Sequence, residues 1–319
     1  MKPDTKTYYD IPEDFMNRLK ERGYKKVTGE QKKEFDPYYD KMNEHWCANT
    51  SFVNLWGWSD TFPVYCKISN GYVYLIQFLR TDGYPVASPF LGCYTKDGIT
   101  EAIREIKKDF EYFEYPLVFM DITPWMLPYF TETGIDFEIE DLRELQDYIY
   151  TPEALWEGLN QSDDRYRYRY FKRRYQYETI ELNSEHADEC LRFMDEHWCK
   201  FEECSKCCGC LKQVIFRVVS KFDTPDEYGI LVRVEGKTAG ICIVSNRNGL
   251  GIYQYKNAVN QIKGINEYLL RECFERYLQN VDVINYTEDM GIENLRYYKE
   301  HLTSHYSLLS KYTLSEKVR

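Results

Sequence analysis

The sequence has 319 residues and a formal net charge of −11, and 43% of its residues are hydrophobic. The length predicts about two domains, and the apolar content excludes a disordered chain. The acidic excess argues against a broad groove that binds nucleic acid regardless of sequence, because neutralising phosphates needs clustered Lys and Arg.

The first twenty residues are polar and contain no apolar export signal. The sequence also has no run of about 20 apolar residues that could span a bilayer, so we expect a cytoplasmic protein. In that compartment the 11 cysteines are expected to be reduced thiols. Residues 10–45 predict helix, with Phe15 and Leu19 on one face and a stop at Gly23.

The rest of the first half alternates strand-like and helix-like segments. Asn70-Gly71 between two apolar runs predicts a β-hairpin, and the apolar spacing from Ile99 to Phe110 predicts an amphipathic helix. Trp56 and Trp58 are expected in the core. The expected strands are residues 62–67, 72–79, 84–92, 117–122 and 137–145, and the expected helices are residues 96–113 and 124–131.

The second half repeats this order of elements without repeating the sequence. Glu235-Gly236 and Asn248-Gly249 are turn signals between strand-like runs. Gln261–Gly264 is a polar loop that enters a helix. The expected strands are residues 228–234, 237–245, 250–259, 281–285 and 306–313. One helix is expected to start at residue 152, and two more are expected over 265–278 and 291–301.

This order predicts an α/β (α+β) protein with two domains, residues 1–148 and 149–319. We expect each domain to contain a mixed, mostly antiparallel sheet flanked by helices. A strand that leads through a loop into a helix presents backbone N–H groups at the helix N-terminus, where the helix dipole favours an anion. The predicted ligand site of the second half therefore lies around Tyr253–Arg296.

Several segments carry a resemblance to known proteins. The element order resembles the GNAT acyltransferase fold, and Gln261-Ile-Lys-Gly264-Ile-Asn266 resembles its pyrophosphate loop, with Asn266 where Gly or Ala is usual. A more specific resemblance, to the DUF2156-type C-terminal module of phosphatidylglycerol lysyltransferases and their Fem-transferase relatives, covers most of the chain. The segments that carry it are Ser51–Trp58, Asp147–Tyr150, Tyr255–Ala258, Ile284–Ile292 and Leu295–Lys299.

The resemblance implies tandem GNAT-like domains and transfer of an aminoacyl group from aminoacyl-tRNA, or of an acyl group from a related donor such as acyl-CoA. The acceptor would be an amine or a hydroxyl, including that of a lipid. Two alternatives stay open: a catalytically silent module that binds a nucleotide or a tRNA end, and an acyl-CoA-dependent N-acetyltransferase. The first half lacks the acidic run of the second and is expected to act as a scaffold.

Four polar residues follow or end the predicted strand 281–285: Asn285, Glu288, Asp289 and Arg296. As catalytic residues, Glu288 or Asp289 would hold the incoming amine or accept its proton, and Asn285 would assist. Arg296 would help to bind the donor. The alternative is a capping and salt-bridge network, in which Asp289 caps the following helix and Arg296 folds back.

Lys256, on the third strand, is expected to neutralise a donor phosphate or a developing oxyanion. Strand alternation predicts Tyr253 and Tyr255 on one face of the sheet and Lys256 on the other. Tyr255 is a candidate for donor binding. Gln261, Lys263 and Gly264 are candidates for cradling a phosphate or the 3′ end of tRNA, with an ordinary turn as the alternative.

Residues 165–174 contain six basic residues interleaved with tyrosines. Basic and aromatic side chains together suit phosphates and stacked bases, so Arg169 and Arg173 are candidates for binding tRNA, CoA or anionic lipid. The strict alternation of residues 165–170 suits a strand, whereas the corresponding family segment is a basic helix. A solvated basic face is the alternative to a binding role.

Five cysteines lie between Cys199 and Cys210, with His197 nearby. Their Cys-x-x-Cys spacing suits zinc or an iron–sulfur cluster. Structural zinc sites usually have two such pairs further apart, so reduced cysteines are preferred here and no metal is assigned. The oligomeric state is left open.

Overall fold

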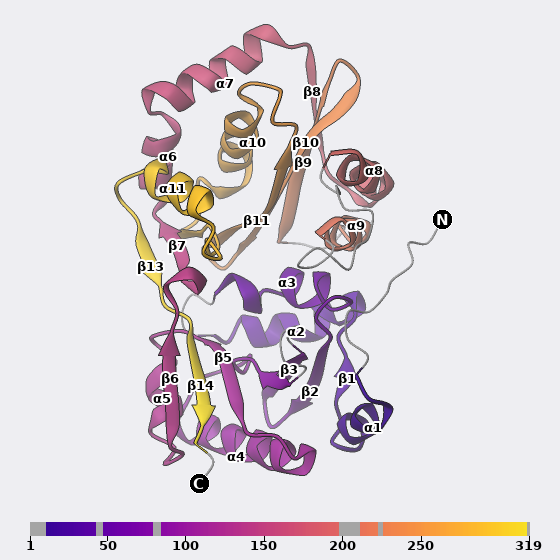
Figure 1. The fold of residues 1–319 in the computed structure, drawn as a ribbon, viewed down its shortest axis with the longest axis vertical. Helices are drawn as coiled ribbons and strands as arrows, with labels where there is room; N and C mark the ends of the chain where they lie inside the picture. Colours follow the sequence, from indigo (N-terminus) through magenta and orange to yellow (C-terminus); the bar gives the residue numbers. More distant parts are fainter. Residues whose placement is uncertain (1–10, 43–46, 79–83, 198–210, 223–225, 318–319) are drawn as a thin grey trace. The chain divides into compact units, whose positions relative to one another are not determined.

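The computed structural model describes residues 11–42, 47–78, 84–197, 211–222 and 226–317. The chain forms two compact units, one of Met1–Leu145 with Leu309–Arg319 and one of Gln146–Leu308. Each unit contains a seven-stranded sheet with helices packed against it (Figure 1). Within the described ranges, no helix is long and apolar enough to cross a bilayer. The cysteine segment 199–210 lies outside the described residues.

The first sheet has the strand order β1-β2-β3-β4-β5-β14-β6, and its described pairs are antiparallel except β4 with β5. The predicted hairpin is confirmed, because Asn70 and Gly71 have φ values of 48° and 82°, as its two-residue turn requires. The strands are β1 (Lys25–Lys26), β2 (Val64–Ser69), β3 (Tyr72–Phe78), β4 (Pro85–Ala87), β5 (Val118–Ile122), β6 (Phe137–Asp141) and β14 (Tyr312–Glu316).

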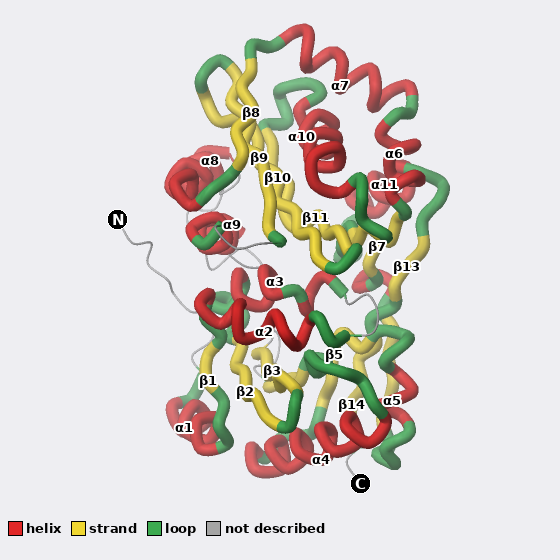
Figure 2. The backbone as a smooth tube through the Cα atoms, turned by 180° about the vertical axis from the view of Figure 1, so that it is seen from behind, coloured by secondary structure: helices red, strands yellow, loops and turns green. Residues whose placement is uncertain are grey.

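Helix α4 (Lys96–Phe113) covers the range predicted from the sequence. The Thr95 hydroxyl accepts a hydrogen bond from the Gly98 N–H at its start, and Glu114 ends it with a left-handed φ of 64°. Its apolar face lies in the core of the first unit. Figures 1 and 2 show α4 on one side of the sheet and α2 and α3 on the other. The other helices are α1 (Glu13–Glu21), α2 (Lys32–Tyr39), α3 (Phe52–Gly57) and α5 (Leu127–Thr131).

The helical prediction for residues 10–45 holds only in part. Helix α1 stops before Gly23, which has a φ of 84°, and β1 precedes α2. The stop at Gly23 is therefore confirmed, and the short strand β1 after it interrupts the predicted helical segment. Trp56 is buried as expected, and Trp58 is half-buried.

The last strand returns to the first unit. The sequence predicts one closing strand over 306–313 in the second half, but the structure contains two: β13 (Ser307–Leu309) in the second sheet and β14 in the first. Strand β14 lies between β5 and β6 and pairs antiparallel with both, which satisfies its backbone groups on both edges. The chain therefore passes from one compact unit to the other after Leu145 and again after Leu308, and residues 309–319 are grouped with the first unit.

The second sheet has the strand order β13-β7-β12-β11-β10-β9-β8. The meander β9–β10–β11 agrees closely with the predicted runs, and its turns at Gly236 and Gly249 have positive φ. The meander consists of β9 (Glu227–Val234), β10 (Lys237–Arg247) and β11 (Leu250–Ala258). The other strands of this sheet, besides β13, are β7 (Asp147–Tyr150), β8 (Tyr177–Glu181) and β12 (Val283–Asn285).

The helices of this unit lie on both sides of its sheet, with α8 and α9 on one side and α6, α7, α10 and α11 on the other (Figure 1). Helix α10 continues into a π-helical turn at Phe274–Leu278. The helices are α6 (Pro152–Leu159), α7 (Ser162–Arg174), α8 (Ala187–His197), α9 (Leu211–Ser220), α10 (Ile265–Cys273) and α11 (Glu293–Leu302).

Residues 165–170 are helical, so the strand suggested by their alternation is wrong. Helical spacing brings Tyr168 and Phe171 together against α10, where their ring centroids lie 5.8 and 4.7 Å from that of Tyr268. Acidic residues occupy the first turn of α7 and basic residues the last, which matches the helix dipole. Packing and charge placement therefore outweigh the two-residue alternation.

Candidate functional site

Strands β11 and β12 separate at the centre of the second sheet. They pair in parallel from Leu250 with Val283 to Ile252 with Asn285. Beyond Ile252, β11 continues to Ala258, and its described pairing there is with β10 alone. The two parallel strands therefore part beyond Ile252. Binding of an extended ligand to the β11 backbone at this point stays a prediction.

A β-bulge lies at the point of separation. Ile243 of β10 pairs with Tyr255 and Val244 pairs with Tyr253, so Gln254 is the extra residue. Directly paired residues share a face of the sheet, which places Tyr253 with Val244, and Lys256 with Cys242, on the face that packs into the core beneath α10. The predicted arrangement is wrong: Tyr253 and Lys256 share this face, and Tyr255 points to the opposite one.

Lys256 lies against helix α11 and near the start of α7. Its ammonium group is 5.0 Å from the centroid of the Tyr298 ring. Burial, together with the negative charge of Glu267, raises the pKa of Asp164, and the positive charges of Arg167 and Lys256 oppose this effect. Lys256 thus contributes positive charge to a group of charged side chains from α7 and from the start of α10, namely Asp164, Arg167 and Glu267.

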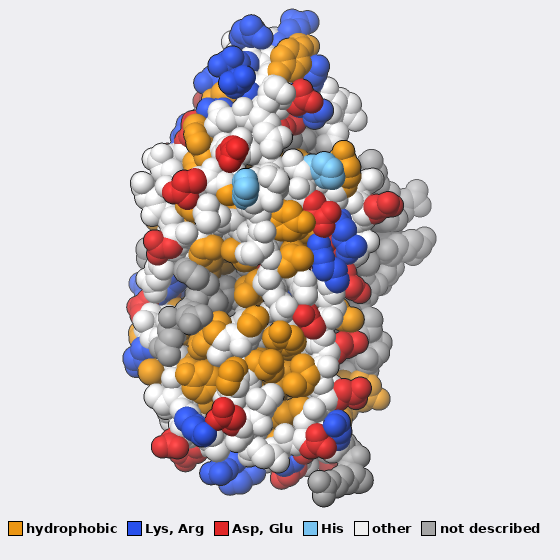
Figure 3. Space-filling model, turned by 90° about the vertical axis from the view of Figure 1, so that its left-hand side faces the viewer, with side chains coloured by type: hydrophobic (Ala, Val, Ile, Leu, Met, Phe, Trp, Pro, Cys, Tyr) orange, Lys and Arg blue, Asp and Glu red, His pale blue; other side chains and the backbone are white. Residues whose placement is uncertain are grey.

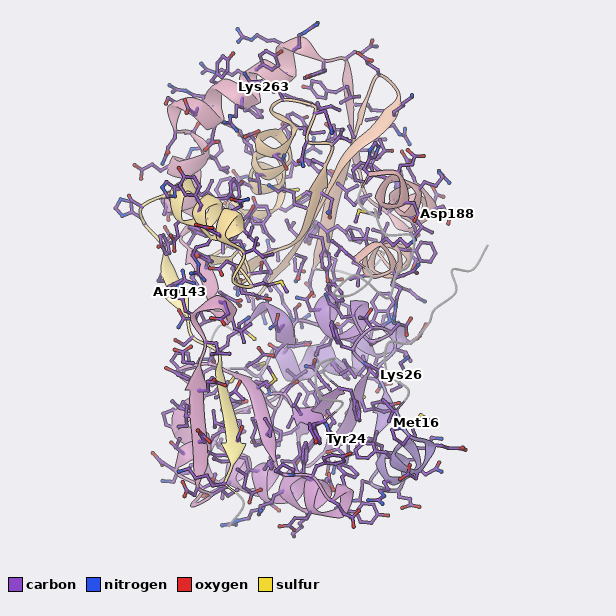
Figure 4. The ribbon with its side chains drawn as sticks, viewed as in Figure 1. Met16, Tyr24, Lys26, Arg143, Asp188 and Lys263 are labelled. Carbon is purple, nitrogen blue, oxygen red and sulfur yellow. The ribbon has the colours of Figure 1, made fainter. Side chains whose placement is uncertain are left out.

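The loop before α10 approaches α7 very closely. Gly264 has a φ of 88°, and a Cβ atom there would lie 2.1 Å from the Arg167 carbonyl oxygen. Glycine is therefore required both by backbone conformation and by space. Lys263 lies beside α7 (Figure 4), with its ammonium 4.9 Å from the Tyr166 ring and 5.0 Å from the Tyr170 ring.

A pocket of about 500 Å³, here called the loop pocket, lies where this loop meets α7. Acids and bases both line it, and Arg167 and Glu267 form an ion pair at 3.2 Å. Lys263 and Gly264 are the two predicted donor-binding residues in its wall. The lining residues are Asp163, Tyr166, Arg167, Asn260, Ile262, Lys263, Gly264, Asn266 and Glu267.

Asp289 is fully buried and ion-paired. Its two carboxylate oxygens accept hydrogen bonds from Arg296 at 3.0 Å each, and it also accepts from the Tyr148 hydroxyl and the Gly291 N–H. Burial raises the pKa of Asp289, but these bonds outweigh it and hold the pKa well below its usual value. The contacts match the capping and salt-bridge interpretation, and proton transfer by Asp289 stays a prediction.

Asn285 is also buried within a hydrogen-bond network. Its amide donates to Asp147 at 2.7 Å, and its carbonyl oxygen accepts from the Thr287 N–H at 2.7 Å. These bonds connect the end of β12 to β7 and to the following turn. This position suits an organising role for Asn285.

Sequence reasoning missed Lys299, which organises the segment that carries Glu288. The buried ammonium of Lys299 donates to the carbonyl oxygens of Tyr286, Thr287 and Glu288. Lys299 stands four residues after Leu295 and three before Leu302, where an amphipathic helix usually has an apolar residue. A lysine at a core-facing helical position was the available signal.

The structure brings only some of the predicted residues into one place. The loop pocket includes neither Lys256 nor Gln261 in its wall, and the residues Tyr255, Asn285, Glu288, Asp289, Arg296, Arg169 and Arg173 also lie outside it. Lys256 is close to Asp164 of α7, whereas the Asn285–Arg296 network lies around the end of β12. No group of three or more metal-binding side chains occurs within the described ranges.

A family model described as phosphatidylglycerol lysyltransferase, C-terminal, matches residues 43–313. No sequence among the curated proteins matches the chain.

Solved structures show the same fold. A conserved protein of unknown function from Bacteroides thetaiotaomicron has a TM-score of 0.79 at 20% identity, covering 92% of this chain and 99% of that one. L-PGS from Bacillus licheniformis has a TM-score of 0.62 at 15% identity, covering 90% and 92%. FemX has a TM-score of 0.59 at 9% identity, covering 88% and 95%.

These likenesses confirm the predicted α/β class with tandem GNAT-like units. The family match confirms the resemblance given by the sequence motifs. Because the matched region includes strands and helices of both units, this chain belongs to the phosphatidylglycerol lysyltransferase C-terminal family of acyltransferases.

Proposed function

We propose that the chain transfers an aminoacyl group from aminoacyl-tRNA, or an acyl group from a related donor, to an amine or hydroxyl acceptor. The observation that carries the proposal is the separation of β11 from β12 beside the loop that begins α10. This arrangement offers backbone donors and a helix N-terminus to the carrier of the acyl group. The family match and the likeness to L-PGS and FemX support an aminoacyl donor.

In the proposed reaction, the nitrogen or oxygen of the acceptor attacks the carbonyl carbon of the aminoacyl ester. The new bond forms as the bond between that carbon and the ribose oxygen of tRNA breaks. The nucleophile loses a proton and the ribose oxygen gains one, so the exchange needs no further reactant. Lys256 would stabilise the oxyanion, and Glu288 would receive the proton.

The buried network around Asp289 would hold this site in place. Asn285, Asp289 and Arg296 would orient the turn that carries Glu288, since their polar atoms are engaged with one another and with neighbouring strands. Lys299 fixes the backbone of the same turn. Gln261, Lys263 and Gly264 would hold the donor, and Tyr255 would act from the other face of β11.

The test is a transfer assay with purified protein and tRNA charged with radiolabelled amino acids, with phosphatidylglycerol vesicles and soluble amines as acceptors. Mass spectrometry identifies the product. The proposal expects an aminoacylated product that disappears in Glu288→Gln and falls sharply in Lys256→Gln. Acetyl transfer from acetyl-CoA without aminoacyl transfer would contradict it.

A catalytically silent binding module is the second candidate. The ion pair between Asp289 and Arg296 favours it, because both groups are already satisfied within the protein. This candidate expects binding of charged tRNA without turnover for any acceptor.

A further inference from the structure

A second pocket lies in the first unit, over strands β4, β5, β14 and β6. Its volume is about 530 Å³, which is within the usual range for sites that hold small molecules. Hydrophobic side chains gather on one surface of the first unit (Figure 3). The pocket is here called the sheet pocket, and the residues that define it are Tyr84, Tyr115, Val118, Met120, Glu140 and Thr313.

The sheet pocket lies on the face of the first sheet that is opposite to α4. Phe119 and Leu314 pair across β5 and β14, and both are fully buried in the core that contains the apolar face of α4. Val118 and Ser315 pair one residue further along, so their side chains point to the other face, where they are only half-buried. Met120 lies on the same face by alternation. This face therefore presents apolar and hydroxyl side chains to a ligand.

Two tyrosines form one wall of the sheet pocket. The rings of Tyr84 and Tyr115 meet edge to face, with centroids 5.5 Å apart and an interplanar angle of 70°. Tyr115 also contacts the ring of Phe15 in the core, at 5.6 Å, whereas Tyr84 is 57% exposed. Val118 and Met120 add aliphatic surface. An aromatic ring or a short hydrocarbon chain bound here would remove apolar surface from water on both sides of the contact.

The polar part of the sheet pocket is acidic. Glu140 of β6 lies in its wall, and Glu138, two residues earlier on the strand, points to the same face. Both side chains are exposed, and neither forms an ion pair within the described ranges. Thr313, which pairs with Glu140, and Ser315 add two hydroxyl oxygens. Carboxylate and hydroxyl oxygens accept hydrogen bonds, and an ammonium group supplies both three donors and the opposite charge.

We propose that the sheet pocket binds a hydrophobic amine. Its aromatic or hydrocarbon body would lie against Tyr84, Tyr115 and Met120, and its ammonium group beside Glu140. The first unit, expected from the sequence to be a scaffold, would then have a ligand site of its own. This inference goes beyond the proposed function and does not depend on it, because binding here requires neither an aminoacyl donor nor transfer.

The charges of the sheet pocket disfavour an anionic amphiphile. A phosphate or carboxylate beside Glu140 would be repelled by this side chain and by Glu138. Among the described residues of the wall there is no Lys, Arg or His that could offset the repulsion. The combination of an apolar wall with uncompensated acids therefore selects a cation over an anion of the same size and hydrophobicity.

The experiment compares three probes that share one body: phenylbutylamine, phenylbutanol and phenylbutyrate. At neutral pH they carry a positive, a neutral and a negative group. Isothermal titration calorimetry on the purified full chain measures the dissociation constant of each probe. Glu140→Gln removes the acid from the wall. Glu138→Gln is the matched control, because it removes the same charge from the same strand and face but lies outside the described lining.

A third variant tests the location of the site. Thr313→Phe places a ring in the pocket wall and is expected to weaken the binding of all three probes. Circular dichroism checks that this variant is folded. If Thr313→Phe does not fold, the comparison of the two glutamate variants decides alone.

The wild-type protein is expected to bind phenylbutylamine about threefold more tightly than phenylbutanol, which is the gain from one exposed ion pair. Phenylbutyrate should bind most weakly. Glu140→Gln should bring the amine to the level of the alcohol, and Glu138→Gln should keep most of the preference. The inference is overturned if the amine shows no saturable binding or if phenylbutyrate binds at least as tightly. Equal effects of the two glutamate variants, or unchanged binding by folded Thr313→Phe, also overturn it.

Discussion

Arg296 donates a hydrogen bond to each carboxylate oxygen of Asp289, one from Nε and one from Nη2, and both bonds measure 3.0 Å. The carboxylate is fully buried, while the arginine side chain is 37% exposed. The arginine therefore lies between solvent and an otherwise enclosed negative charge.

Arg296→Gln is expected to lower the free energy of unfolding. Removing one partner of a buried pair leaves an uncompensated charge, and the partial exposure of Arg296 places the cost at the lower end of the usual range. Urea unfolding measures it. Arg296→Lys, which keeps the charge but loses the bidentate geometry, should cost less. An Arg296→Gln protein as stable as wild type would show that solvent or a neighbour replaces the pair.

Stability should depend on Glu189 at acidic pH. The hydrogen bond from Arg233, opposed by burial, lowers the pKa of Glu189 to about 2. Because this pKa lies below the unfolded value of about 4.3, the contribution is fully present above that value and is lost as pH falls toward 2. Glu189→Gln should therefore reduce the free energy of unfolding at pH 7 and converge with wild type near pH 2. A constant difference across this range would contradict the assignment.

Gly264→Ala should be costlier than Gly236→Ala. Both glycines have positive φ, 88° and 78°, but an added Cβ meets the Arg167 carbonyl oxygen only at Gly264 and meets nothing within 4 Å at Gly236. Gly236→Ala, the control, should lower the free energy of unfolding by about 1 kcal/mol through backbone conformation alone. Gly264→Ala should lose at least about 1 kcal/mol more, because α7 must move. Equal losses in urea unfolding would refute a tight contact between the loop and α7.

Lys299→Met and Lys256→Met should separate stability from transfer. Lys299→Met leaves three buried or half-buried carbonyl oxygens without their donor and is expected to cost about 3 kcal/mol. Lys256→Met should change the free energy of unfolding by less than about 1 kcal/mol, because its ammonium mainly faces an aromatic ring. Under the proposed function it should nevertheless abolish most transfer. Full transfer by Lys256→Met would remove Lys256 from the site.

Local sequence signals predict elements that are stabilised locally. Asn70-Gly71 predicts its hairpin and the apolar spacing from Ile99 to Phe110 predicts α4, because turn conformation and helical periodicity depend on residues close in sequence. The alternation along β11 fails at Gln254, since a bulge depends on how two strands pair and leaves no composition signal. The sequence therefore indicates that Lys256 is on this strand but not which face it occupies.

The same distinction applies to α7 and to the network around Asp289. The two-residue period of residues 165–170 predicts a strand, whereas contacts with Tyr268, distant in sequence, stabilise a helix. The return of Arg296 to Asp289 spans seven residues and was predictable as a capping alternative. The hydrogen bond from Tyr148 to Asp289 spans 141 residues and was not.

The placement of β14 between β5 and β6 has a consequence for protein synthesis. The ribosome must finish the entire second unit before the strand that completes the first sheet is available. Until then β5 and β6 lack the strand that pairs with both of them, and the first unit has two unpaired strand edges. A fragment of residues 1–148 would keep these edges unpaired because it lacks β14. It is therefore expected to aggregate unless residues 309–319 are supplied as a separate peptide.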